Sequence, residues 1–146
     1  MKPIESSSVA ADPGLRVDLQ TVLLVDPESE TRDTTKRLLQ REGYVVVAVS
    51  SGSAMLQVAH KLVPRLVLLA TKLPDFSSLE VLREFKGDPL LSNIPVVLCS
   101  GSTSKPEERA AGYDAGADSF LTHPLDEQEF LARLRACLRQ SRSIEL

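Results

Sequence analysis

The sequence predicts a single α/β domain in which a parallel sheet is covered by helices on both faces. Short apolar segments alternate with amphipathic segments along most of the chain. This alternation is typical of βαβ units, whose crossovers make neighbouring strands parallel. The segment 66–70 has no polar interruption, as expected for a strand buried on both faces. The chain has 146 residues, 42% of them hydrophobic, which is enough to build one core.

Composition excludes several classes of function. The formal net charge of −3 provides no basic surface for a phosphate backbone, so we expect no nucleic-acid binding by this chain alone. No apolar run approaches the roughly 20 residues that span a bilayer, and the N-terminus lacks a signal-peptide pattern. We therefore expect a cytoplasmic protein without membrane contact, in which Cys99 and Cys137 are reduced and packed as small hydrophobic residues.

The elements follow from apolar runs and from the turn residues between them. Residues 1–20 are rich in serine and proline without a period, so they predict a flexible leader, and residues 141–146 a tail after a domain at 21–140. Strands are predicted at residues 21–25, 45–49, 66–70, 94–100 and 119–122. Helices are predicted between and after them, at about residues 27–42, 54–62, 79–87, 104–116 and 126–140.

Three helix starts carry capping patterns. Asp26 is expected to cap the first helix, with Pro27 as its first residue, because proline needs no hydrogen-bond partner there. The other two patterns have the spacing of a capping box, at Ser104 with Glu107 and at Asp126 with Glu129.

Functional side chains are expected where the strands end. The carboxyl ends of parallel strands meet at one edge of a doubly wound sheet, where such folds bind their ligands. Asp26, Ala70, Ser100 and His123 stand at these ends, and Lys72 follows in the loop after Ala70. This edge therefore holds a carboxyl group, a methyl group, a hydroxyl group, an imidazole and an ammonium group.

Several motifs resemble the receiver domain of two-component response regulators, over about residues 21–140. They are Leu23-Leu24-Val25-Asp26, residues 64–74, Leu79-Glu80-Val81-Leu82, Ile94-Pro95-Val96, Ala115-Gly116-Ala117-Asp118 and Thr122-His123-Pro124. The resemblance implies a flavodoxin-like (βα)5 fold with strand order 2-1-3-4-5 in three α/β/α layers. It also implies a role in phosphorelay signal transduction.

Receivers of this kind carry an acidic pair after the first strand, a phosphoacceptor Asp ending the third, a Ser or Thr ending the fourth, and a Lys after the fifth. The carboxylates hold Mg²⁺, and the metal and Lys neutralise the transferred phosphoryl group. By position, the acidic pair is Asp26 and Pro27, the acceptor position is Ala70, the hydroxyl is Ser100 and the Lys position is His123. The resemblance therefore implies a pseudo-receiver that is not phosphorylated, with no catalytic residue.

The cofactor prediction follows from the same positions. Asp26 is the only retained candidate metal ligand, and Glu28 would have to reach back from the following helix, so no Mg²⁺ is expected. Lys72 is predicted either to occupy the metal position and pair with Asp26 or to point into solvent. Ser100 is expected to bond nearby backbone or water.

Other residues are assigned to switching and to partners. Phe120 stands at the aromatic switch position of receivers but lacks a hydroxyl group, and Pro124 is expected to keep a cis peptide bond. Asp118 and Arg133 belong to the surface of the fourth helix, fifth strand and last helix, which the family uses for homodimers or for docking other signalling proteins. We therefore predict a protein interaction module, not an enzyme.

Three alternatives remain open from sequence alone. The first is a phosphate-accepting receiver in which Asp75 or another acidic residue replaces the acceptor. The second is an α/β enzyme that binds a flavin or a nucleotide, although no glycine-rich phosphate loop follows the first strand. The third is a fragment whose output domain has been removed.

Overall fold

The structure is a computed structural model that describes residues 21–101, 104–123 and 126–145, and side chains up to residue 140. The leader predicted at 1–20 and the cis peptide predicted at Pro124 lie outside the described residues. In the described part, no helix has the length and apolar character needed to cross a lipid bilayer.

The sheet has five parallel strands, and their order along the sheet is β2-β1-β3-β4-β5. This is the predicted flavodoxin-like order. The strands are β1 (Thr21–Val25), β2 (Val45–Val49), β3 (Leu66–Ala70), β4 (Val96–Ser100) and β5 (Ser119–Thr122). Four of the five match the predicted ranges. The fourth begins two residues later than expected because Pro95 has no N–H to donate to a neighbouring strand.

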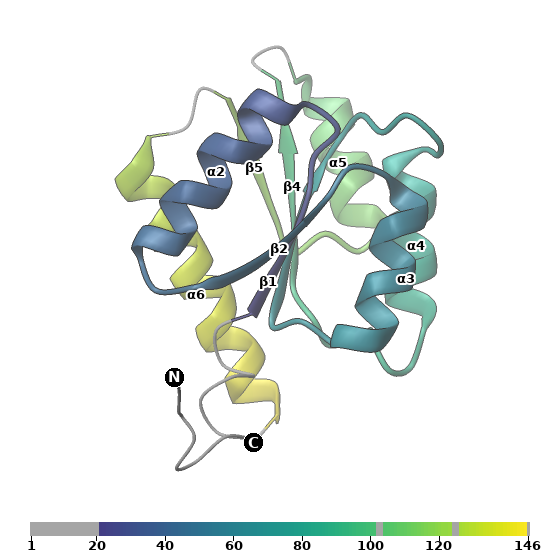
Figure 1. The fold of residues 1–146 in the computed structure, drawn as a ribbon. Coiled ribbons are helices and arrows are strands. Elements are labelled where there is room, and N and C mark those ends of the chain that lie inside the picture. The colour runs from purple at the N-terminus through teal and green to yellow at the C-terminus, as the bar shows by residue number, and fades with distance from the viewer. Residues whose placement is uncertain (1–20, 102–103, 124–125, 146) are drawn as a thin grey trace.

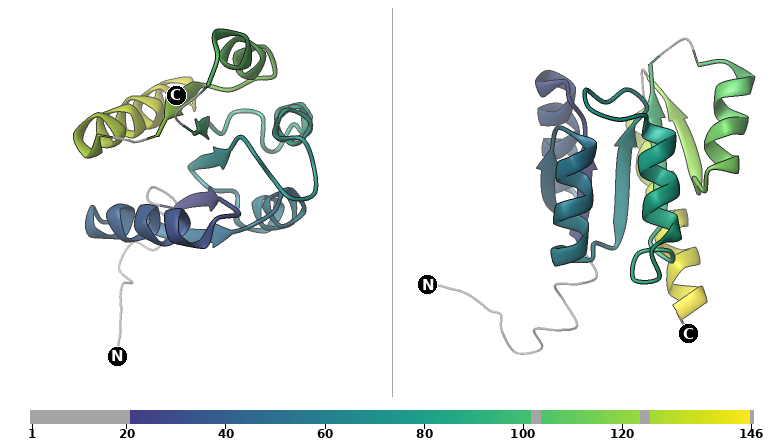
Figure 2. Two further views of the ribbon diagram at one scale, coloured as in Figure 1. Left: turned by 90° about the horizontal axis from the view of Figure 1, so that it is seen from above. Right: turned by 90° about the vertical axis from the view of Figure 1, so that its right-hand side faces the viewer.

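Five helices cover the sheet and complete the three layers. They are α2 (Ser29–Arg41), α3 (Gly52–Leu62), α4 (Ser78–Gly87), α5 (Pro106–Asp114) and α6 (Glu127–Glu145). Helices α2 and α6 cover one face, and α3, α4 and α5 cover the other (Figure 1). Seen from above, the sheet runs between these two groups of helices (Figure 2).

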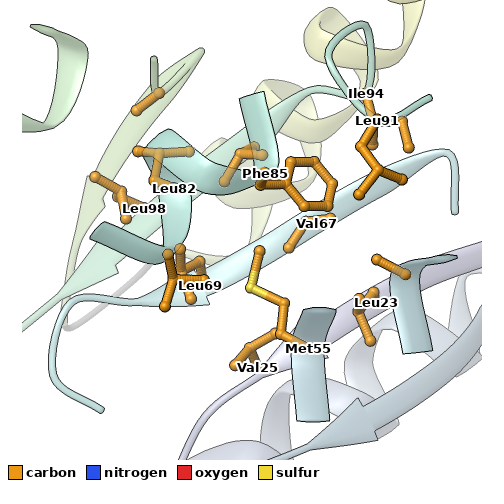
Figure 3. Packing of buried hydrophobic residues seen from close by; sticks show 14 of the residues in the cluster. Leu23, Val25, Met55, Val67, Leu69, Leu82, Phe85, Leu91, Ile94 and Leu98 are labelled. Carbon is orange, nitrogen blue, oxygen red and sulfur yellow. The ribbon is translucent and has the colours of Figure 1, made fainter. Parts of the chain in front are cut away.

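Two apolar clusters fill the space between the layers. Because side chains alternate along a strand, Leu23 and Leu69 point into the cluster beneath α3 and α4, whereas Leu24 and Leu68 point towards α2 and α6. Figure 3 shows the first cluster, in which Phe85 lies among aliphatic side chains from several elements. Burial on both faces explains why the central strand is uniformly apolar.

Two of the predicted helix starts are wrong by one or two residues. Asp26 does not cap α2, which begins at Ser29 with Glu28 as its N-cap residue. The Asp26 carboxylate instead accepts the Glu28 N–H at 3.0 Å in a local turn, which delays the helix.

The fourth helix differs in the same way, because Pro106 is well suited to the first helical position. Its N-cap residue is therefore Lys105, whose N–H donates to Glu108 Oε1 at 2.7 Å. The hydroxyl of Ser104 instead lies 3.1 Å from that of Thr122. The Asp126 cap is confirmed, because its Oδ2 accepts the Glu129 N–H at 2.9 Å.

An imidazole joins the end of α3 to the loop after α4. His60 Nδ1 lies 2.8 Å from the Leu56 carbonyl oxygen, and His60 Nε2 lies 2.5 Å from Asp88 Oδ2. A carbonyl oxygen and a carboxylate can only accept, so both contacts are hydrogen bonds when the ring is an imidazolium with a hydrogen on each nitrogen. The pKa of His60 is raised, first by the hydrogen bond to Asp88 and then by the hydrogen bond to Leu56. The charge of nearby Glu84 raises it further.

This contact predicts pH-dependent stability. The pKa of His60 is raised in the folded protein, so the imidazolium adds to the free energy of unfolding. This stabilisation is complete below the unfolded pKa of about 6.5 and is lost as the pH rises through the folded pKa. The His60 bond likewise lowers the pKa of Asp88, so the pair is also lost when acid protonates that carboxylate. NMR titration should give a higher His60 pKa in the natural chain than in Asp88→Asn; equal values would contradict the assignment.

Candidate functional site

The candidate site is the edge of the sheet where the strands end together. The Thr71 N–H, just after β3, donates to the Cys99 carbonyl at 3.0 Å. The His123 N–H, just after β5, donates to the Ser100 carbonyl at 2.9 Å. These bonds extend the sheet by one residue and hold the ends of β3, β4 and β5 in register. Side chains distant in the sequence therefore meet at one edge.

A cavity of about 660 Å³ opens at this edge. A volume of this order is typical of small-ligand sites. The cavity brings together all six residues that the sequence placed at the strand ends or just after them. We call this set the degenerate site: Asp26, Pro27, Ala70, Lys72, Ser100 and His123.

Asp26 is the half-buried carboxyl group of the cavity. Burial raises its pKa, while the hydrogen bond from the Glu28 N–H opposes that rise. The Glu28 charge raises the pKa further, and the nearby charges of His123 and Arg32 lower it. Arg32 also donates through Nη1 to the Asp26 carbonyl oxygen at 2.8 Å. Asp26 is thus held by its own turn and by one arginine of α2.

Lys72 lines the cavity but is exposed. Among the described residues, no ion pair joins Lys72 to Asp26, so the prediction that its ammonium occupies the metal position finds no support in this arrangement. The cationic groups that act on the Asp26 carboxyl are His123 and Arg32 instead. A long lysine side chain gains more hydration by remaining in solvent than by pairing with one half-buried carboxylate.

The hydroxyl and methyl positions are both fixed by backbone contacts. Ser100 is buried, and its hydroxyl donates to the Gly101 carbonyl at 2.9 Å, as expected for a serine that bonds local backbone. The Ala70 carbonyl accepts the Ser78 hydroxyl at 2.7 Å, which ties the end of β3 to the start of α4. Ala70 lines the cavity, and its only side-chain group is a methyl.

These residues do not fit Mg²⁺, the cofactor that the resemblance implies for an intact site. The carboxylates that line the cavity belong to Asp26 and Glu28, and Glu28 already accepts the Thr31 hydroxyl at 2.6 Å. Pro27 and Ala70 have no side-chain oxygen. Within the described ranges, no three His, Cys, Asp or Glu side chains converge as metal ligands. Mg²⁺ demands near-octahedral oxygen coordination, which this set does not supply.

Several lining residues were not predicted from the sequence. Thr31 and Thr35 of α2 and Phe130 of α6 face the cavity. The four-residue spacing of Thr31, Thr35 and Leu39 was a signal that they share the inner face of α2. Cys99 also lines the cavity, where burial first and the Asp26 charge second raise its pKa to about 12. Its thiol is therefore protonated and unreactive.

Asp75 has a structural role outside the cavity. Its Oδ1 accepts the Gly52 N–H and its Oδ2 accepts the Ser53 N–H, each at 3.0 Å, at the start of α3. The Ser53 N–H is the main cause of the lowered pKa of Asp75, and burial opposes it. Asp75 is not among the residues that line the cavity. Its carboxylate therefore secures the loop after β3 to the start of α3, the helix that precedes β3 in the chain.

The predicted switch and interface residues are engaged within the domain. Phe120 is buried in the cluster beneath α3 and α4. Asp118 Oδ2 accepts the Val96 N–H at 2.8 Å and Lys86 Nζ at 2.9 Å, so it connects β5 to β4 and α4. Arg133 Nη1 donates to the Phe120 carbonyl oxygen at 3.2 Å. Both charged residues therefore have intramolecular partners before any protein docks.

Comparison with known proteins identifies the family of the chain. The model of the response regulator receiver domain matches residues 22–135. The chain belongs to this family. The match covers β1 from Val22, the other four strands and the first half of α6, so it includes the strand ends that form the cavity.

The receiver is similar in sequence to curated transcriptional regulators. It is 35% identical over 120 residues to the transcriptional regulatory protein KdpE of Mycobacterium tuberculosis, covering 82% of this chain and 51% of that protein. It is 34% identical over 128 residues to the phosphate regulon protein PhoB of Pseudomonas aeruginosa, covering 84% of this chain and 53% of that protein. The chain thus spans about half the length of these relatives.

Solved receiver structures share its fold. A CheY-like receiver domain protein from Methanospirillum hungatei superposes with a TM-score of 0.78 at 23% identity, covering 85% of this chain and 97% of that chain. The chemotaxis protein CheY4 of Vibrio cholerae gives a TM-score of 0.76 at 22% identity, covering 81% and 98%. At these identities the likeness concerns the receiver fold alone.

Proposed function

We propose that this receiver signals without phosphorylation, as a protein interaction module whose state is set by the partner it binds. The observation that carries the proposal is Ala70, whose methyl group lies at the end of β3 in the cavity. Phosphoryl transfer to a receiver needs a carboxylate nucleophile, and a methyl group has no lone pair to attack phosphorus. Removing the nucleophile removes the reaction.

The surroundings of Ala70 support the same conclusion. A phosphoryl group in transfer needs a metal or fixed cations to neutralise its charge. Pro27 offers no ligand, and the pKa of Asp26 is raised mainly by burial, so the cavity is poorly suited to a divalent ion. His123 stands where receivers of this kind carry a lysine.

Substitution of Asp75 for the acceptor is disfavoured. Its carboxylate accepts two backbone N–H groups at the start of α3 and lies outside the cavity lining. Attack on a phosphodonor would require breaking both of these hydrogen bonds. Phosphorylation of Asp75 would therefore release the loop after β3 from the start of α3.

The proposal places the protein in the cytoplasm, where it acts by binding other signalling proteins. Homodimerisation through α5, β5 and α6 remains part of it, because Arg135 and Arg139 on α6 are exposed. Partner binding can switch such a domain only if the partner prefers one of its conformations. The module is not an enzyme in this account.

Mass spectrometry of the intact protein after incubation with acetyl phosphate and Mg²⁺ tests the proposal. We expect no mass increase of one phosphoryl group on the natural chain. A stoichiometric adduct that hydroxylamine removes would contradict the proposal, because it would reveal an acyl phosphate on another carboxylate.

A double variant tests whether the missing carboxylates are the reason that the cavity does not bind Mg²⁺. Pro27→Asp combined with Ala70→Asp would place three carboxyl groups at this edge with Asp26. We expect this variant to bind Mg²⁺ at millimolar concentration, because oxygen ligands would then converge from β1 and β3. The natural chain should show no such binding by calorimetry.

A further inference from the structure

A second cavity lies on the opposite side of the strand ends, between α4 and α5. Its volume is about 380 Å³, enough for one or two side chains of a partner. The lining includes the apolar side chains of Leu98, Ala111 and Phe120, the hydroxyl group of Ser100 and the carboxylates of Glu107 and Glu108. We call this cavity the α4–α5 groove.

The apolar base of the groove is formed before any partner binds. Gly112 allows α5 to approach β4 closely, because a Cβ atom there would lie 2.7 Å from Leu98 Cδ1 and 3.4 Å from Phe120 Cδ2. Phe120 is only 6% exposed, so its ring is already packed into the wall. Ala111, with its single methyl group, leaves the space above this base open.

The rim of the groove is acidic. Glu107 and Glu108 stand in the first turn of α5, and both are exposed. Glu108 accepts the Lys105 N–H through one oxygen, whereas no hydrogen bond or ion pair of Glu107 occurs among the described residues. The nearby Arg109 donates to Ser104 through Nη1, at 3.2 Å to its carbonyl oxygen, and so is occupied. An incoming cation would therefore find Glu107 available.

We propose that the α4–α5 groove docks a partner segment that inserts one apolar side chain, of leucine or phenylalanine size, and places a lysine or arginine beside Glu107. Apolar anchors in preformed pockets supply most of the affinity of such interfaces, and complementary charge supplies specificity. The inference rests on the proposed function, since it names the chemistry of the partner that sets the state of the module.

The groove also connects docking to the degenerate site. Thr71 and Ser100 line both the groove and the larger cavity, so they form a shared wall between the two. An anchor side chain in the groove contacts this wall from the side opposite Asp26 and Ala70. Partner binding in the groove can therefore shift Thr71 and Ser100 at the strand ends without a phosphoryl group.

Selection from a displayed library of random twelve-residue peptides tests the inference, using the natural chain never exposed to a phosphodonor. We expect enriched peptides to contain one large apolar residue next to a lysine or arginine. Isothermal calorimetry should give dissociation constants in the micromolar range, and amide shifts should map binding to Ala111, Phe120 and Ser100.

Three variants make the measurement specific. Glu107→Lys should weaken the selected peptides by about tenfold or more, and Ala111→Trp should do the same by filling the groove. Glu30→Lys is the matched control, because Glu30 is the second residue of α2 as Glu107 is of α5. It should bind the peptides as the natural chain does. Circular dichroism verifies that each variant is folded.

Several results would overturn the inference: no enriched peptide, equal binding to Ala111→Trp, or peptides that lack a basic residue and bind Glu107→Lys unchanged. The failures remain distinguishable from those of the proposed function. A phosphoryl adduct would contradict the proposed function and leave the peptide result standing. If no phosphoryl adduct forms and no peptide binds through the groove, only the docking inference is overturned, and the proposed function stands.

Discussion

Replacing Lys86 with alanine is expected to lower the free energy of unfolding by about 2–3 kcal/mol, because its ammonium joins three segments of the domain. Lys86 Nζ donates to the Ile94 carbonyl at 2.7 Å and to Asp118 Oδ2 at 2.9 Å. The Lys86 side chain is 17% exposed and Ile94 is buried, so the Ile94 carbonyl would lose its partner where water reaches it poorly, whereas the Asp118 side chain is 39% exposed and would be hydrated. Urea unfolding followed by circular dichroism measures the change.

Two variants separate charge from packing in this prediction. Lys86→Met keeps most of the aliphatic stem and loses only the ammonium, so it should recover a minor part of the stability. Asp118→Asn still accepts the Val96 N–H and should cost less than Lys86→Ala. If the free energy of unfolding of Lys86→Ala lay within about 0.5 kcal/mol of that of the natural chain, the Lys86 contacts would not stabilise the fold.

Gly116→Ala is expected to cost about 3 kcal/mol, because it combines backbone strain with a steric overlap. Gly116 has φ +118°, a conformation that residues with a Cβ atom rarely adopt. A Cβ atom there would also lie 2.8 Å from Lys86 Cγ. The aliphatic part of the Lys86 side chain therefore packs against Gly116, where only glycine leaves room for it.

Gly43→Ala is the matched control for this variant. Gly43 has φ +96°, but a Cβ atom there would meet nothing within 4 Å, so only the backbone cost of about 1 kcal/mol should appear. Combining Gly116→Ala with Lys86→Ala should cost less than the sum of the two, since the overlap is removed. Equal costs for Gly116→Ala and Gly43→Ala would contradict the steric part of the argument.

The sheet was predictable because most of its strands are buried, with only the edge strand β2 partly exposed. The uniform apolar runs of β1, β3 and β4 have no other stable location than the centre of a parallel sheet, and their limits were nearly correct. Helix starts were less predictable. Asp26 and Ser104 have the correct residue types for caps, but a competing turn and a proline one or two positions later moved both helices.

The composition of the cavity was also predictable, whereas the interactions of its charges were not. Strand ends fixed the positions of Asp26, Ala70, Ser100 and His123, because parallel strands must end at one edge. The side chain of Lys72 could turn either way, and a sequence does not encode that choice. The cap that Asp75 provides to α3 joins segments more than 20 residues apart, so no local pattern announced it.

One measurement directly tests whether the site responds to phosphoryl chemistry. Amide spectra of the labelled chain should be recorded before and after addition of Mg²⁺ with acetyl phosphate. We predict that the resonances of Asp26, Thr71 and Ser100 stay in place, because neither metal nor phosphoryl group finds ligands there. Saturable shifts at these amides, extending to Phe120, would show a working phosphorylation switch and contradict the account.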